Sequence, residues 1–217
     1  MVKTILITGA TDGIGKHLAK KLASQGHHVI LHGRNPQKLE LSLQEVRAVS
    51  LRGKVSSYLA DFSKLDDVYR FVEEIKQDFQ SIDVLFNNAG LYAGKKRKAS
   101  AENVELTFML SVLVPYILTT ELSSLLEKSA DGRVINTSSY MHHFAKVKDL
   151  DFGFENDYNP GLAYNNSKLY TIWMTRYLAR DFFLSSSSIT VNSYHPGLIS
   201  TNLGNNSSDE KTKKSLF

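Results

Sequence analysis

The sequence contains no cysteine, and this absence excludes two kinds of site. Without thiols the chain can form neither a disulfide framework nor a metal site with thiolate ligands. The seven histidines, which include the pairs His27-His28 and His142-His143, lack the spacing and the carboxylate neighbours of a metal site. We therefore predict that the protein binds no metal. The missing thiols also fit a reducing, cytoplasmic location.

Long apolar runs are missing as well. The longest, residues 108–118, contains Ser111 and Pro115 and is too short to span a membrane. Residues 1–7 are followed by polar Thr8 and are too short for a signal peptide or an anchor. We therefore expect a protein without a membrane span.

Neither sign of charge is in large excess, because the formal net charge is only +4. The densest basic run is Lys95-Lys96-Arg97-Lys98, which has the composition of a nucleic-acid or acidic-membrane contact. No aromatic residues are interleaved with it, as they are in proteins that bind single strands. We interpret the run as a solvated loop and expect no nucleic-acid partner.

The pattern that is present is an alternation of short β-branched runs with amphipathic helical segments. A chain of 217 residues without a Pro/Gly/Ser-rich linker predicts one domain, residues 1–217, ending in a polar tail at about 204–217. The alternation predicts a doubly wound, Rossmann-like parallel sheet in three α/β/α layers. The expected strands are residues 2–7, 29–31, 55–59, 82–86, 133–136 and 189–193. The expected helices are residues 14 to about 23, 36–49, 65–79, 101–128 and 161–184.

A glycine-rich loop joins the first expected strand to the first expected helix. Its glycines permit positive φ angles and close backbone approach, and the helix that follows offers free N–H groups to a pyrophosphate. The spacing is Gly-x-x-x-Gly-x-Gly instead of the more familiar Gly-x-Gly-x-x-Gly. The position between strand and helix predicts a dinucleotide site, with candidate residues Gly9, Thr11, Asp12, Gly13, Ile14 and Gly15.

Doubly wound sheets bind ligands beyond the carboxyl ends of their strands, so the residues after the other strands are candidates too. Arg34 follows the second strand without an acidic neighbour, which favours the 2′-phosphate of NADP over the free hydroxyl of NAD. Asp61 follows the third strand and could accept from an adenine amino group or simply cap a turn. Small or rigid residues follow the fourth and sixth strands and let the backbone approach a cofactor: Asn88, Ala89, Gly90, Pro196 and Gly197.

Two residues of the last helix suggest acid–base chemistry. Tyr164 and Lys168 lie four apart, so they share one helical face, and the ammonium favours the phenolate while the phenol can still transfer a proton. Taken alone, the pair also fits a solvated helix face. Ser139, after the fifth strand, is a further candidate, although strand-end serines are common.

Together these residues resemble the short-chain dehydrogenase/reductase family over essentially the whole chain. The matching motifs are the 8–15 loop, Asn87-Asn88-Ala89-Gly90, the set Ser139, Tyr164 and Lys168, and Pro196-Gly197. The segment between Ser139 and Tyr164, with its two adjacent histidines, is similar to the retinol-dehydrogenase-like branch.

The resemblance implies roles for these residues. Tyr164 would be the general acid in carbonyl reduction and the general base in alcohol oxidation, and Lys168 would lower its pKa and hold the nicotinamide ribose. Ser139 would hydrogen-bond the substrate oxygen. Thr201 would contact the carboxamide, unless it is only a cap. The implied protein is an NADP(H)-dependent oxidoreductase acting on an alcohol or carbonyl of a small, fairly apolar molecule, and a homodimer or tetramer through its long helices.

Two departures from the family pattern leave an alternative open. Ser111 stands where many members carry an asparagine that continues the proton relay, and a hydroxyl has fewer donors than an amide. The chain also ends at Phe217, so we expect the seventh strand and the substrate lid to be missing. The alternative is therefore a catalytically impaired NADP(H)-binding protein that serves as a redox sensor or scaffold.

Overall fold

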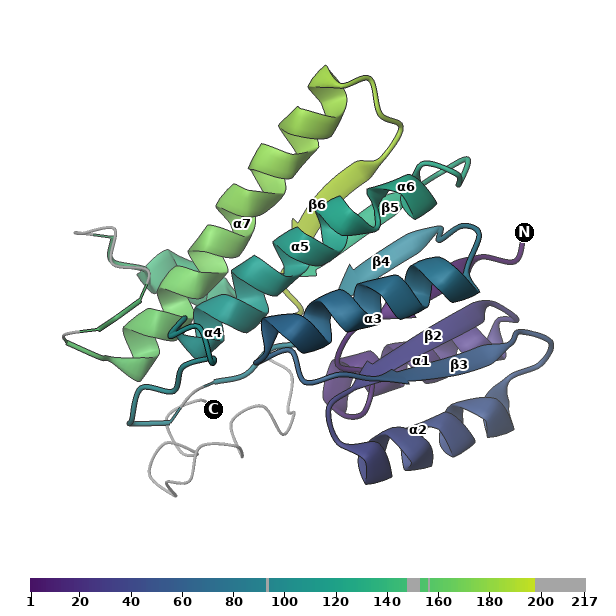
Figure 1. The fold of residues 1–217 in the computed structure, drawn as a ribbon, viewed down its shortest axis with the longest axis horizontal. Helices are drawn as coiled ribbons and strands as arrows, with labels where there is room; N and C mark the ends of the chain where they lie inside the picture. Colours follow the sequence, from purple (N-terminus) through teal and green to yellow (C-terminus); the bar gives the residue numbers. More distant parts are fainter. Residues whose placement is uncertain (93, 148–152, 156, 198–217) are drawn as a thin grey trace.

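A computed structural model describes residues 1–92, 94–147, 153–155 and 157–197 of the chain. Its six strands form one parallel sheet in the order β3-β2-β1-β4-β5-β6 (Figure 1). The strands are β1 (Thr4–Ile7), β2 (His28–Gly33), β3 (Val55–Leu59), β4 (Val84–Asn87), β5 (Arg133–Thr137) and β6 (Thr190–Tyr194). This confirms the predicted fold class and all six predicted strands. The order reverses between β1 and β4, which is where such folds bind their ligands.

The two faces of the sheet bury separate cores. Alternate residues of one strand enter different cores, as Ile5 and Ile7 pack with the first and second helices while Leu6 packs on the opposite face. The helices of the first face are α1 (Gly13–Ser24) and α2 (Pro36–Val49), and those of the second are mainly α3 (Leu65–Asp78), α5 (Val114–Glu121) and α7 (Pro160–Leu184) (Figure 1). Both sheet faces therefore carry helices, as the alternation predicted.

Side-chain caps begin two of the long helices. The Asn35 Oδ1 atom accepts from the Lys38 N–H at 2.9 Å before α2, and the Asn159 Oδ1 atom accepts from the Leu162 N–H at 2.9 Å before α7. Each cap precedes a proline at the first helical position, whose missing N–H needs no partner there. The start of α7 fixes the position of the Tyr164 and Lys168 pair.

The helix predicted over roughly residues 101–128 is present, but it starts later and is less regular than expected. Residues 101–105 form a loop, and the segment divides into α4 (Leu106–Phe108), a π-helical turn η1 (Met109–Leu113), α5 and α6 (Ser123–Leu126). The π turn has a physical cause: Pro115 has no N–H to donate to the carbonyl four residues earlier, that of Ser111. The Thr171 hydroxyl of α7 donates to this carbonyl instead, at 3.0 Å.

Three further features bear on the predictions. No helix in the described part of the chain is long and apolar enough to cross a membrane. In this part of the chain β3 and β6 are the edge strands. The predicted tail at 204–217, Thr201 and the predicted loss of a seventh strand all concern residues 198–217, which lie outside the described residues.

Candidate active site

The glycine-rich loop of residues 8–15, called the cofactor loop here after its predicted role, packs closely on itself and on the loop after β4. Two of its glycines have no room for a side chain. A Cβ atom on Gly15 would lie 2.3 Å from the Gly9 carbonyl oxygen and 2.5 Å from the Asn88 Nδ2 atom. Gly9 has φ +65°, and a Cβ atom there would lie 2.9 Å from the Ala89 Cα atom. The loop after β1 and the loop after β4 are therefore in close backbone contact.

Asn88 and Thr8 hold these two loops together. The Asn88 Nδ2 atom donates to the carbonyls of Thr8 at 3.0 Å and Gly9 at 3.2 Å. The Thr8 Oγ1 atom accepts from the N–H groups of Asn88 at 2.9 Å and Ala89 at 3.0 Å. Asn88 was predicted to bind the cofactor, whereas its side chain here ties down the loop. Thr8, which the sequence reasoning did not single out as a site residue, is its buried partner.

Asp12 and the first turn of α1 complete the loop. The Asp12 Oδ1 atom accepts from the Gly13 N–H at 2.7 Å, so Asp12 is the N-cap of this helix. The N–H groups of the first turn, to which Ile14 and Gly15 belong, have no helical carbonyl to bind. The predicted strand–loop–helix unit is thus formed with its helix beginning at Gly13.

The structure places Arg34 and Asp61 differently. Arg34 is exposed directly after β2, next to Gly33, where a Cβ atom would meet the Thr11 side chain of the cofactor loop. The Asp61 Oδ1 atom accepts from the N–H and the hydroxyl of Ser63, at 3.1 and 2.8 Å. The structure therefore shows the turn contact of Asp61, and its contact with an adenine amino group stays a prediction.

Tyr164 is a buried phenol at the start of α7, with 8% of its surface exposed. Burial raises the pKa of Tyr164, while a hydrogen bond with the Ser139 side chain acts in the opposite direction. The ring of Tyr92 lies beside it, with 5.3 Å between ring centroids. The side chains of Tyr164 and Ser139 therefore meet, as the matched motif predicted.

Lys168 lies one turn further along α7 and is 5% exposed. Its Nζ atom donates to the Thr137 carbonyl at 3.1 Å and lies 5.5 Å from the centroid of the Tyr164 ring. A Cβ atom on Gly90 would lie 3.8 Å from the same nitrogen. Burial lowers the pKa of Lys168 to about 8. The ammonium thus lies where the loops after β4 and β5 meet.

Lys168 was predicted to lower the pKa of Tyr164, but the pKa of Tyr164 in this structure is not lowered. The pKa of Tyr164 is raised, not lowered, because loss of solvation is its largest influence. The charge of Lys168 is itself disfavoured by burial and its nitrogen is bound to a carbonyl. Sequence spacing identified the neighbours but could not weigh charge against burial.

Two serines follow β5 and differ in role. The Ser138 hydroxyl donates to the Lys168 carbonyl at 2.9 Å and so fastens α7 to the sheet. Ser139 is the N-cap of the short helix η2 (Tyr140–Phe144), and its Oγ atom accepts from the Met141 N–H at 3.3 Å. Its carbonyl accepts from the His142 Nδ1 atom at 2.7 Å. Ser139 therefore has a structural role as a cap in addition to its contact with Tyr164.

Ser111 lies in the π turn and is 4% exposed. Its Oγ atom is buried and has no hydrogen-bond partner among the described residues. Its carbonyl begins a line of buried polar contacts that crosses α7 and enters the sheet. The members after Ser111 are Thr171, Thr175, Asn136 and Asn87. The sequence reasoning missed this line, because hydroxyls and amides inside hydrophobic stretches give no signal of their own.

The other predictions have mixed outcomes. Pro196 and Gly197 follow β6 at the same end of the sheet, and Gly197 has φ +82°. The basic run is not wholly a solvated loop, because Arg97 donates to the Gly153 carbonyl at 2.7 Å and to Asn103 through two further hydrogen bonds. Its three lysines are exposed, as expected.

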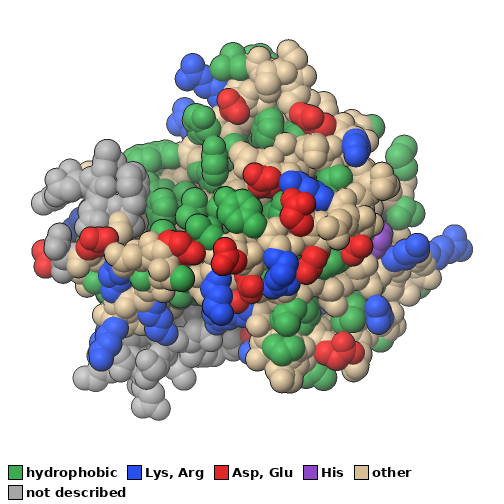
Figure 2. All heavy atoms as spheres, viewed as in Figure 1, with side chains coloured by type: hydrophobic (Ala, Val, Ile, Leu, Met, Phe, Trp, Pro, Cys, Tyr) green, Lys and Arg blue, Asp and Glu red, His purple; other side chains and the backbone are tan. Residues whose placement is uncertain are grey.

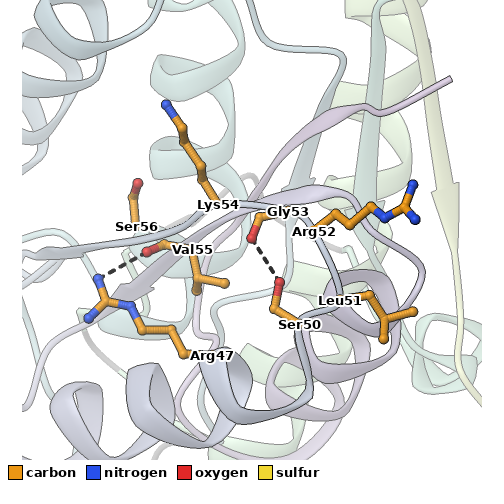
Figure 3. Close-up of a pocket in the computed structure, with 8 residues that line it drawn as sticks. All are labelled: Arg47, Ser50, Leu51, Arg52, Gly53, Lys54, Val55 and Ser56. Atoms are coloured by element: carbon orange, nitrogen blue, oxygen red, sulfur yellow. Dashed lines mark hydrogen bonds between the residues drawn. The ribbon is translucent and has the colours of Figure 1, made fainter.

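An open pocket at the other end of the sheet is separate from these residues. It is lined by Arg47 and residues 50–56, which precede and begin β3 (Figure 3). The Arg47 Nη2 atom donates to the Val55 carbonyl at 3.2 Å, and the Ser50 hydroxyl donates to the Gly53 carbonyl at 2.8 Å. These contacts close the turn between α2 and β3, and no candidate residue lies among them.

Comparison with protein families places the chain among known proteins. A family model described as short chain dehydrogenase matches residues 3–212. Retinol dehydrogenase 13 of Homo sapiens is 34% identical over 203 residues, which are 93% of this chain and 60% of the relative. Retinol dehydrogenase 11 of Mus musculus is 34% identical over 99% of this chain and 67% of its own length. The chain thus spans about 60% of the length of the first of these relatives.

Solved structures have the same fold. An uncharacterised protein from Mycobacterium paratuberculosis superposes with a TM-score of 0.79 at 30% identity, over 93% of this chain and 70% of that one. A metagenomic short-chain oxidoreductase in complex with NADP has a TM-score of 0.72 at 26% identity, over 90% of this chain and 82% of its own. An NADH-dependent reductase complexed with NAD has a TM-score of 0.72 at 28% identity, over 90% of this chain and 78% of its own. Both nicotinamide cofactors therefore occur on this fold.

Proposed function

Because the chain belongs to the short-chain dehydrogenase family, in its retinol-dehydrogenase-like branch, we propose that it is an oxidoreductase that interconverts an alcohol and a carbonyl. The observation that carries the proposal is the buried contact of the Tyr164 phenol with Ser139, with Lys168 one helical turn away and the cofactor loop at the same end of the sheet. A nicotinamide dinucleotide, when bound, supplies or accepts the hydride.

The cofactor loop fits such a dinucleotide. Gly9 and Gly15 leave a backbone surface that any Cβ atom would fill, and α1 presents its first-turn N–H groups next to it. Gly90 keeps the space beside the Lys168 nitrogen free of a side chain. These residues would hold the pyrophosphate and the nicotinamide ribose respectively.

The protein's own part in the reaction is proton transfer and orientation. The raised pKa of Tyr164 keeps its phenol protonated at neutral pH, which is the state that a general acid needs for carbonyl reduction. Ser139 would donate its hydroxyl proton to the substrate oxygen as negative charge develops there. Lys168, with a pKa of about 8, can release or take up a proton close to neutral pH behind the tyrosine.

We infer a preference for NADP over NAD from Arg34. Its guanidinium is exposed after β2 next to the Thr11 side of the cofactor loop, and no carboxylate stands at position 33 to receive a ribose hydroxyl. Arg34→Ala should therefore weaken NADPH binding by about tenfold and leave NADH binding unchanged. The loss corresponds to one charge-assisted contact between the guanidinium and the 2′-phosphate, which contributes about 1–2 kcal/mol. Equal losses for both cofactors would contradict this preference.

The decisive experiment measures turnover and cofactor binding separately. A panel of small apolar aldehydes and ketones, chosen because curated relatives are named retinol dehydrogenases, is reduced with NADPH and followed by nicotinamide absorbance. Tyr164→Phe should lower kcat by about 10²- to 10⁴-fold and retain NADPH binding. Tyr92→Phe is the matched control, because it removes a phenol hydroxyl from the adjoining ring. Equal rates in wild type and Tyr164→Phe would refute the assignment.

The alternative function, a cofactor-binding protein with little turnover, rests on Ser111. Its buried hydroxyl has no hydrogen-bond partner among the described residues. A proton path from Lys168 through this hydroxyl would therefore need a bridging group in addition to these residues. Micromolar NADPH binding with no turnover across the panel would favour a sensor or scaffold. Gain of turnover in Ser111→Asn would then identify the missing group.

An assembly of two or four copies is part of the proposal. Hydrophobic side chains gather on the surface over α5 and α7 (Figure 2). The exposed aromatic residues of these two helices are Tyr116 in α5 and Trp173 and Tyr177 in α7, Tyr177 to 59%. Light scattering should show a dimer or tetramer that Trp173→Glu dissociates. The cytoplasmic location stays a prediction.

A further inference from the structure

His32 is a polar residue in an apolar setting. It lies in β2, two positions before Arg34, and only 3% of its surface is exposed. Its ring stacks on Phe62, with centroids 3.8 Å apart and planes 9° from parallel, and meets the edge of Phe71 at 5.3 Å. An aliphatic side chain would fill such a position without the loss of hydration that a buried imidazole suffers.

Both ring nitrogens of His32 are bound, and each to a different loop. The Nδ1 atom accepts from the Gly9 N–H at 3.2 Å, and the Nε2 atom lies 3.1 Å from the Ala60 carbonyl oxygen. An N–H group only donates and a carbonyl only accepts, so Nδ1 carries no proton and Nε2 carries one. The geometry thus selects one neutral tautomer. Burial supports the neutral form, because it lowers the pKa of His32 to about 4.

The two loops that His32 joins are both candidate cofactor loops. Gly9 opens the turn that would hold the pyrophosphate, and Ala60 immediately precedes Asp61, where the adenine end of a dinucleotide would lie. Main-chain hydrogen bonds also join both loops to β2. The Ala10 N–H donates to the His32 carbonyl at 2.9 Å, and the Ala60 N–H donates to the Gly33 carbonyl at 3.2 Å. One side chain therefore spans the gap between the two loops across the end of β2.

We propose that His32 is a positioning residue for the adenosine half of the cofactor: its imidazole sets the distance between the loop after β1 and the loop after β3. It touches no reacting atom, so it should govern cofactor affinity and not the chemical step. The inference rests on the proposed binding of a nicotinamide dinucleotide at this edge of the sheet.

Three substitutions separate the two hydrogen bonds. His32→Leu removes both. In His32→Asn the side-chain amide can still accept from Gly9 but cannot reach Ala60, and in His32→Gln it can still donate to Ala60 but loses the geometry for Gly9. His28→Leu is the matched control, because His28 lies on the same strand and the same sheet face, next to Phe79, at the far end from both loops.

The measurement is the dissociation constant of NADPH and of NADH, by fluorescence, together with kcat at saturating cofactor and the thermal midpoint. We expect His32→Leu to raise both dissociation constants about tenfold, which corresponds to 1.4 kcal/mol. His32→Asn and His32→Gln should each raise them by about threefold, and kcat at saturation should stay within twofold of wild type. A purely structural role would instead lower the thermal midpoint without changing the affinity of the folded protein.

Each outcome decides the question. Dissociation constants of His32→Leu within twofold of those of His28→Leu overturn the inference, while the proposed function stands. If His32→Leu does not fold, wild-type affinity in both His32→Asn and His32→Gln overturns it equally. A wild-type protein that binds neither cofactor overturns this inference and the proposed function together.

Discussion

Two regions at the carboxyl edge of the sheet, one at β1 and β2 and the other at β4 and β5, consist of different chemical groups. Around β1 the cofactor loop is shaped by glycines, main-chain carbonyls and the amide of Asn88, in contacts that leave no room for a Cβ atom at Gly9 or Gly15. Around β5 the site consists of buried polar side chains, among them Lys168 with a lowered pKa and Ser111, whose hydroxyl has no hydrogen-bond partner in the described part of the chain. The first region is fixed by close backbone packing, whereas the second buries the charged group of Lys168.

Stability and function depend on the same contacts in one of these regions and on opposing ones in the other. In the cofactor loop the same contacts fold the chain and shape the binding surface, so a substitution there should harm both. At the catalytic end, burial of a charge opposes folding, so a substitution there can harm activity and favour the folded state. The predictions below test this contrast, beginning with the largest effect.

Gly15→Ala should have the largest effect on the cofactor side. The new Cβ atom would lie 2.3 Å from the Gly9 carbonyl oxygen and 2.5 Å from Asn88 Nδ2, so the loop must move. We expect the protein to lose about 2–3 kcal/mol of stability and at least about tenfold in NADPH affinity. Urea denaturation and fluorescence titration measure both. Gly26→Ala is the control, because nothing apart from its chain neighbours lies within 4 Å of its Cβ position. Its only cost is that alanine rarely adopts a φ of +85°.

Lys168→Met should lower kcat by at least about 10²-fold and yet stabilise the protein. The pKa of Lys168 falls from 10.5 to about 8 on folding, so at pH 7 burial of its charge opposes folding by about 3 kcal/mol. The hydrogen bond from its Nζ atom to the Thr137 carbonyl, which the variant loses, offsets about 1 kcal/mol of this cost. The variant should therefore be about 1–2 kcal/mol more stable at pH 7.

The same pair of proteins gives a pH test with a definite sign. Between pH 8 and 10.5 the unfolded chain binds more protons at Lys168 than the folded chain, so wild-type stability from this group rises with pH through that window. The advantage of Lys168→Met should shrink accordingly between pH 7 and pH 10. Because Tyr164 is present in both proteins, its own titration cancels in the difference. A variant less stable than wild type at pH 7 would show that Lys168 is not buried as a charge.

Asn88→Ala tests the contact between the two regions. It removes the Nδ2 donor to the carbonyls of Thr8 and Gly9, and we expect a loss of about 1–2 kcal/mol and a severalfold weaker NADPH affinity. Asn192→Ala, at an exposed position of β6, should change stability by less than about 0.5 kcal/mol. Unchanged NADPH affinity in Asn88→Ala would separate the stability of the loop from its function.

Ser111→Ala should have the smallest effect on stability. The hydroxyl has no hydrogen-bond partner among the described residues, so its removal should change the free energy of unfolding by less than about 0.5 kcal/mol. If the hydroxyl takes part in proton transfer, kcat should fall severalfold at unchanged NADPH affinity. An unchanged kcat would remove Ser111 from the catalytic set.

One expectation was met only in part because it depended on a partner far along the chain. The helix predicted over residues 101–128 contains a π turn, because Pro115 cannot donate to the Ser111 carbonyl and Thr171 of α7 does. Asp61 has the position of an adenine ligand and its Oδ1 atom accepts from the neighbouring Ser63, so its contact with adenine stays a prediction. Local patterns cannot show which of two acceptable partners a group will take.

The sequence by itself determined the parallel α/β sheet, its six strands and the end of the sheet where Gly9, Ser139, Tyr164 and Lys168 gather, because strand and helix periodicities and turn chemistry are local properties of a chain. Only the tertiary structure decided the charge balance of the site and the contacts that hold it. The pKa of Tyr164 is raised by burial, and His32 reaches two loops at once. Solvation and long-range contacts depend on what surrounds a group in space, and spacing along the chain does not record that.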